Sequence, residues 1–115
     1  MNTKRPQTSF HAFDLSLSLI AALVPLVARI EQLDRDLGRQ LRKAASSVSL
    51  NLGEGRRRIG KDRLHLWRIA DGSAEETRVC LHVAAAWGYI EEADAAKALA
   101  IVDQILAICW TLTRR

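Results

Sequence analysis

The chain has 115 residues, 49% of them hydrophobic, and a formal net charge of +4. A chain of this length can bury a core as one domain without disulfides or a structural metal. Cys80 and Cys109 lie far apart, without a CxxC pair or histidines at ligand spacing, so we expect buried, reduced thiols. No leader pattern opens the chain and no uninterrupted apolar stretch reaches the roughly 18 residues of a membrane span, which predicts a cytoplasmic protein without a membrane partner.

The charge is distributed unevenly along the chain. Residues 1–68 hold 13 lysines and arginines against 6 aspartates and glutamates, whereas residues 69–115 hold 4 against 7. A basic region attracts polyanions, so nucleic acid is the first partner to consider. The alternative is that these arginines only solvate helix surfaces.

The first helical pattern covers about residues 10–30. Residues 1–8 show no periodicity, so we expect them to be a disordered lead-in to a single helical bundle over 9–115. Pro25 cannot donate a backbone hydrogen bond, and we expect it to kink this helix rather than break it. The predicted core face, at spacings of three and four, is Phe13, Leu17, Ile20, Val24 and Val27.

The second pattern begins after Asp34 or Asp36, either of which can cap a helix, and ends at a pair of glycines before three arginines. The third pattern starts near Lys61, and Gly88 is placed to end it. The predicted core face of the second helix is Leu37, Leu41, Ala44, Ala45, Val48 and Leu52. That of the third is Leu66, Ile69, Ala70, Ser73, Thr77, Cys80, Leu81 and Ala84.

The last helical pattern starts at about Glu91 and is heptad-like. Its predicted core face is Ala95, Leu99, Val102, Leu106, Cys109 and Thr113. Short connections between helices favour antiparallel neighbours. The sequence therefore predicts an all-α protein, an up-down-up-down antiparallel four-helix bundle.

The third and fourth helices carry more apolar residues than one core face requires. The additional positions are Gly72, Val79, Val83 and Ala86 on the third helix, and Ile101, Ile105, Ile108 and Leu112 on the fourth. Large exposed apolar patches mark association sites, so these residues predict a homo-oligomer interface. The alternative is that they widen the core contact of a tightly packed bundle.

A polar seam is expected beside the core face of the second helix. Ser47, Asn51, Glu54 and Arg58 share one flank there, where Glu54 and Arg58 form an i,i+4 pair and Asn51 can donate to Glu54. A single carboxylate without a second titratable group nearby is a weak sign of catalysis. We expect the seam to fix helix register or a subunit contact.

The strongest functional signal is a cluster of basic residues between the second and third helices. It comprises Arg56, Arg57, Arg58, Lys61, Arg63 and Arg68, and can extend along the second helix through Arg39, Arg42 and Lys43. Consecutive arginines at a turn suit several phosphates along a nucleic-acid backbone. Base readout is less favoured, because aromatic residues do not alternate with the arginines and Trp67, Trp87 and Trp110 are expected to pack or line an interface.

Catalytic and metal chemistry are poorly supported by the sequence. The three histidines are scattered, the serines lack a neighbouring base, and no Gly-rich phosphate loop follows a strand. The Glu-x-x-His pattern of di-iron bundles is missing as well. The sequence therefore predicts a protein that is not an enzyme and needs no cofactor.

The cluster is preceded by a motif, Ala-x-x-Ser-Val-x-x-Asn-Leu-Gly-Glu-Gly over residues 44–55, that resembles the 23S rRNA intervening-sequence proteins, the S23 or four-helix-bundle family. Two further runs resemble it, so the likeness covers nearly the whole chain; Gly53 and Pro25 depart from the family pattern. The matching positions are Ala44, Ser47, Val48, Asn51, Leu52, Glu54, Gly55, Leu66, Ala70, Gly72, Ser73, Glu75 or Glu76, and 87–90.

The resemblance implies a four-helix bundle that assembles into a ring, commonly a homopentamer, and a biological role that is largely undefined. Related bundles are accessory proteins of diversity-generating retroelements, which implies nucleic acid and a reverse transcriptase as partners. Our leading hypothesis is a homo-oligomeric module that binds RNA or DNA backbone with little sequence preference. The alternative is a protein-protein adaptor, such as a reverse transcriptase accessory subunit.

Overall fold

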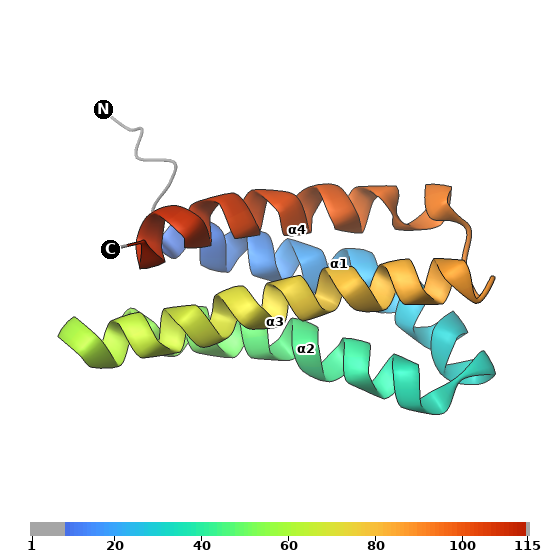
Figure 1. The fold of residues 1–115 in the computed structure, drawn as a ribbon, viewed down its shortest axis with the longest axis horizontal. Coiled ribbons are helices and arrows are strands. Elements are labelled where there is room, and N and C mark those ends of the chain that lie inside the picture. Colours follow the sequence, from blue (N-terminus) through green and yellow to red (C-terminus); the bar gives the residue numbers. More distant parts are fainter. Residues whose placement is uncertain (1–8, 115) are drawn as a thin grey trace.

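The computed structural model describes residues 9–114, which form four helices packed side by side (Figure 1). The predicted lead-in, residues 1–8, lies outside the described residues. Each helix contacts the next one in the chain, and the first also contacts the last. This arrangement confirms the predicted all-α up-down-up-down bundle. The helices are α1 (Ser9–Leu33), α2 (Arg35–Gly55), α3 (Gly60–Ala86) and α4 (Glu92–Thr113).

Local sequence signals set the helix ends. Of the two candidate caps of α2, Asp34 is the one used, because its carboxylate accepts a hydrogen bond from the Leu37 amide at 3.1 Å. Gly88 follows Trp87, the C-cap residue of α3, and has a φ of +82°, a left-handed conformation that glycine adopts without strain. Glu91 and Asp94 form a reciprocal capping box at the start of α4.

The core face of α1 differs from the predicted one. The helix runs unbroken through Pro25, but its fully buried positions are shifted by about one residue from the expected set. Leu17 and Val24, expected in the core, are 49% and 62% exposed. This helix is apolar on two adjacent flanks, so periodicity alone chose the wrong one. The buried residues of α1 are Ala12, Ser16, Leu19, Leu23, Leu26, Val27 and Ile30.

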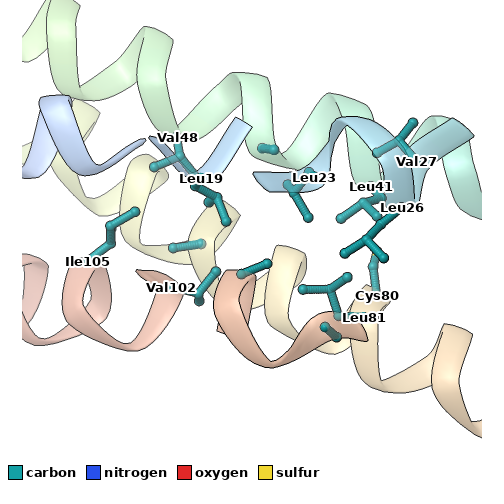
Figure 2. Packing of buried hydrophobic residues seen from close by; sticks show 14 of the residues in the cluster. Leu19, Leu23, Leu26, Val27, Leu41, Val48, Cys80, Leu81, Val102 and Ile105 are labelled. Carbon is teal, nitrogen blue, oxygen red and sulfur yellow. The ribbon is translucent and has the colours of Figure 1, made fainter. Parts of the chain in front are cut away.

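The other three helices contribute most of the residues expected in the core. All six predicted positions of α2 are buried, whereas Ile69 of α3 is exposed and Leu66 is half-buried. Figure 2 shows Leu19 and Leu23 of α1 between the other helices. A buried polar contact joins α1 and α2, where the hydroxyl of Ser49 donates to that of Ser16 at 2.8 Å. The Ser16 hydroxyl donates in turn to the Phe13 carbonyl, so both buried groups are satisfied.

Two helices are apolar enough to satisfy the length and composition of a membrane span. They are Phe10–Leu33, with a mean hydropathy of 1.9, and Glu92–Thr113, with 1.6. A third of the apolar window of each helix is buried inside the bundle, and core helices of soluble proteins have the same composition. The absence of a membrane partner therefore stays a prediction.

Both cysteines are free and buried, as expected. Burial raises the pKa of the Cys109 thiol to about 12, with a smaller contribution from the negative charge of Asp71. Burial also raises the pKa of Cys80, and Glu76 adds to that effect. Both thiols are thus held in their neutral, unreactive form at physiological pH.

Candidate nucleic-acid interface

The turn between α2 and α3 projects at the end of the bundle where α1 begins and α4 ends (Figure 1). Arg56 caps α2, and backbone hydrogen bonds from Arg57 to Glu54 and from Arg58 to Gly55 continue into the turn. All three arginine side chains are exposed. The turn therefore leaves all three side chains accessible to solvent.

Arg63 has a role that the sequence did not indicate. Its guanidinium donates to the carbonyls of Gly55 and Arg56, both at 3.1 Å, and lies 5.2 Å from the centre of the Trp67 ring. These carbonyls belong to the end of α2, where the helix dipole is negative. Arg63 thus ties the first turn of α3 to the last turn of α2. Its Nε and Nη2 atoms are already bonded to these carbonyls, so we do not count it among the phosphate contacts.

Trp67 supports this junction from within the bundle. It is only 7% exposed, which confirms the expectation that it packs rather than stacks on a base. A Cβ atom at Gly55 would lie 2.5 Å from its Nε1 atom, so glycine is needed there for the ring to approach α2. Trp87 and Trp110 are 68% and 61% exposed in the single chain, so they do not pack in its core, and their place at a subunit interface stays a prediction.

The remaining basic residues of the cluster differ in how far their charge is already neutralised. Arg58 forms an ion pair with Glu54 at 2.7 Å, as predicted. Arg56 lies over the ring of Phe10, 4.6 Å from its centre, which leaves its charge in place. Within residues 9–114, Arg57, Lys61 and Arg68 have neither an ion pair nor a side-chain hydrogen bond. These three are the most available cations of the cluster.

The proposed extension along α2 does not form one continuous patch with the turn. Arg42 pairs with Glu31 of α1 at 2.9 Å, and this hydrogen bond and charge raise the pKa of Arg42 further. Arg39 and Lys43 are exposed. Arg39 lies 17 residues before Arg56, which corresponds to about 25 Å along the axis of an α-helix. These α2 residues form a separate basic surface.

The polar seam joins two helices rather than forming a network around Glu54. Asn51 donates to the carbonyl and the hydroxyl of Ser47, at 2.9 and 3.0 Å, so the expected hydrogen bond to Glu54 is wrong. Ser73 of α3 donates to the Ser47 hydroxyl at 2.7 Å. The seam thus fixes how α3 lies against α2, and Glu54 faces solvent with Arg58.

The predicted association surfaces of α3 and α4 have different outcomes. Gly72, Val79, Val83 and Ala86 of α3 are exposed, as the prediction required. The prediction is wrong for Ile105 and Ile108 of α4, which are buried in the core of the single chain because the core face of α4 is wider than expected. Ile101 and Leu112 are partly buried against the same core.

Sequence reasoning missed an exposed apolar surface on the other side of the molecule. The second flank of α1, with Leu17 and Val24, borders a groove next to α2. The missed signal was the presence of two apolar flanks on α1. For metal chemistry, residues 9–114 contain no group of three or more His, Cys, Asp or Glu side chains placed to hold an ion.

The family model described as 23S rRNA-intervening sequence protein matches residues 10–110. The chain belongs to this family. A solved structure from Bacteroides thetaiotaomicron, a protein of unknown function from the S23 ribosomal protein family, is similar in fold with a TM-score of 0.80. It is 18% identical, and the match covers 90% of this chain and 99% of that one. No curated protein matches the chain.

Proposed function

We propose that the chain is a non-enzymatic, homo-oligomeric module that acts in the cytoplasm and binds the phosphate backbone of RNA or DNA through the α2–α3 turn. The observation that carries the proposal is the availability of charge at this turn. Arg56, Arg57 and Lys61 are exposed and have no carboxylate partner within the described residues. The family description, a protein of 23S rRNA intervening sequences, is consistent with a nucleic-acid context.

The chemistry of the turn favours backbone contacts over recognition of a single ligand. Guanidinium groups bind phosphate oxygens with two parallel hydrogen bonds, and arginines that project in different directions reach different phosphates. The surrounding hollow next to Lys61, lined by Gly60, Leu64 and Leu112, is open and has a volume of about 460 Å³. Apart from the cations and the buried indole of Trp67, the side chains that line this hollow are apolar, and they offer few groups for a base edge to bind. The predicted binding therefore has little sequence preference.

Repetition of the turn in an oligomer would strengthen binding. A few phosphate contacts per subunit give modest affinity, and copies held together raise the effective concentration of every further contact. Self-association would therefore strengthen backbone binding.

The experiment compares two double variants that each remove two exposed, unpaired cations. R57A/K61A removes charge at the turn, and R35A/K97A removes the same charge elsewhere. Affinity for labelled single-stranded RNA, duplex RNA and duplex DNA is measured at low salt. We expect R57A/K61A to bind about 10-fold to 100-fold more weakly and the control to bind like the native chain. Equal losses in both variants would contradict a localised site, and no binding by the native chain would contradict nucleic-acid binding.

A protein adaptor, such as a reverse transcriptase accessory subunit, is the second candidate. The observation that favours it is the exposed apolar side chain of Ile59 within the turn, 80% accessible, with Leu50 of α2 exposed next to the turn residues. A phosphate backbone makes no apolar contact with these side chains, whereas an acidic protein surface with an apolar centre would bury them. An I59S/L50S variant that binds nucleic acid normally but fails to co-purify a reverse transcriptase encoded beside it would support the adaptor. Normal co-purification by that variant would count against it.

A further inference from the structure

We propose, on the basis of the backbone binding proposed above, that Glu54 competes with nucleic-acid phosphate for Arg58 and thereby limits the affinity of the α2–α3 turn. While the pair is intact, Arg58 makes no phosphate contact, although it follows directly after Arg57 in the exposed part of the turn. Glu54 is then the residue that determines how many cations of the turn a phosphate backbone can use.

The local backbone places Glu54 and Arg58 next to each other. Glu54 lies in the last turn of α2, and Arg58 follows four residues later, after the helix has ended. The Nη2 atom of Arg58 lies 2.7 Å from the Oε2 atom of Glu54, which is the distance of a charge-assisted hydrogen bond. The amide of Arg58 also donates to the Gly55 carbonyl at 3.1 Å. The turn therefore keeps the guanidinium within reach of the carboxylate.

The pair lies in the wall of a hollow beside α1 and α2. The hollow has a volume of about 650 Å³, and Arg57, Arg58 and Glu54 line it together. The remaining lining residues are Phe13, Ser49, Leu50 and Gly53. Glu54 thus places a negative charge in the same hollow as two of the arginines. A phosphate that enters there to reach Arg58 meets the carboxylate that already holds it.

A carboxylate and a phosphate use the same hydrogen-bond donors of a guanidinium. The Glu54–Arg58 pair is exposed, at 54% and 45% for the two side chains, so water screens it and the attraction is weak. Its advantage is proximity, because a tethered carboxylate has a high effective concentration at the guanidinium. The expected result is a several-fold reduction in affinity.

Arg58 differs from its neighbours in how its charge is held. Arg56 lies over the ring of Phe10 and keeps its charge available, whereas Arg63 donates to backbone carbonyls whose place is fixed by the fold. The partner of Arg58 is one exposed side chain. A single substitution at Glu54 can therefore release this cation without disturbing the packing of the helices.

The test releases Arg58 with the variant E54Q, which keeps the shape of the side chain and removes its charge. The matched control is E75Q, because Glu75 pairs with Arg78 at 2.9 Å on the exposed side of α3 and the change in net charge is the same. Glu75 lies 15 residues after Gly60, about 22 Å along the helix axis, or about two Debye lengths at 0.1 M salt. Affinity for labelled single-stranded RNA and duplex DNA is measured over a salt series.

We expect E54Q to bind about 3-fold to 10-fold more tightly than the native chain at low salt. The logarithmic salt slope should become steeper by about 0.7–0.9 per bound subunit, which corresponds to one added phosphate contact. E75Q should bind like the native chain. The variant E54Q/R58Q, which removes both members of the pair, should return to the native affinity and slope.

Three results would overturn the role of Glu54. They are an unchanged affinity in E54Q, an equal gain in E54Q and E75Q, which indicates an effect of net charge alone, and a shallower slope in E54Q/R58Q than in the native chain, which indicates that Arg58 contacts phosphate while it is paired. Circular dichroism shows whether each variant folds. If R57A/K61A weakens binding and E54Q does not change it, the role of Glu54 is wrong and the proposed function stands.

Discussion

The two turns that involve α3 lie at opposite ends of the bundle and differ in how many of their polar side chains are hydrogen-bonded within the fold. At the α3–α4 turn, the Tyr89 hydroxyl donates to Asp34 at 3.0 Å and Arg29 donates to the Tyr89 carbonyl at 2.7 Å. A capping box closes the start of α4 beside them. At the α2–α3 turn, three consecutive arginines are exposed and Ile59 offers no side-chain cap to α3.

This difference shows that a count of basic residues is a poor guide to a binding surface. Arg29 at one end and Arg63 at the other are both engaged by backbone carbonyls, and their charge stabilises the fold. Arg57 and Lys61 carry the same charge with no such engagement. The number of free cations at each end therefore follows from tertiary contacts.

The largest expected difference in stability between the two ends concerns their tryptophans. Trp67→Ala removes a buried ring at the α2–α3 junction and should lower the free energy of unfolding by about 3–5 kcal/mol. Trp87→Ala at the other end removes an exposed ring and should cost less than about 1 kcal/mol. Urea denaturation followed by circular dichroism measures both. If both variants lost the same free energy of unfolding, the difference in burial between the two tryptophans would not be present in solution.

A smaller effect separates two arginines of the same cluster. Arg63→Ala removes hydrogen bonds to the end of α2 and should lower the free energy of unfolding by about 1–2 kcal/mol. Arg57→Ala should leave stability unchanged within about 0.5 kcal/mol and weaken nucleic-acid binding instead. Denaturation and binding are measured on both variants. The assignment fails if Arg57→Ala destabilises the fold as much as Arg63→Ala does.

The smallest effect concerns the closed turn and uses the single tyrosine of the chain. Burial, then the hydrogen bond and negative charge of Asp34, raise the pKa of Tyr89 above its ordinary value of 10.0. Because the folded state holds the proton more tightly, this contribution to stability is present below pH 10 and is lost as the pH rises through the raised pKa. Absorbance titration of phenolate should give a midpoint above 10 in the native chain and a lower one in Asp34→Asn. Equal midpoints would show that the contact is absent in solution.

Much of the fold could be predicted because its signals are local. Asp34 and Gly88 mark helix ends by their own chemistry, and the apolar face of α2 is the sole apolar flank of that helix. The face of α1 could not be chosen in this way, because both flanks are apolar and packing selected the one that contains Leu19 and Leu23. Ile105 and Ile108 were misplaced for the same reason on α4.

The sequence predicted which residues form the candidate site but not the contacts that these residues make. The run of arginines predicted a basic turn, and the turn presents Arg56, Arg57 and Arg58 at the surface. The engagement of Arg63 depends on carbonyls at the end of another helix, and the hydrogen bond from Ser73 to Ser47 joins α3 to α2. Neither contact has a signature in sequence spacing.

The salt dependence of RNA binding tests the central claim most directly. In a plot of the logarithm of the binding constant against the logarithm of the salt concentration, each phosphate contact makes the slope steeper by about 0.7–0.9. We expect a steep slope for the native chain, a slope shallower by about two per bound subunit for R57A/K61A, and the native slope for R35A/K97A. The same slope in all three proteins would contradict the assignment of phosphate contacts to the α2–α3 turn.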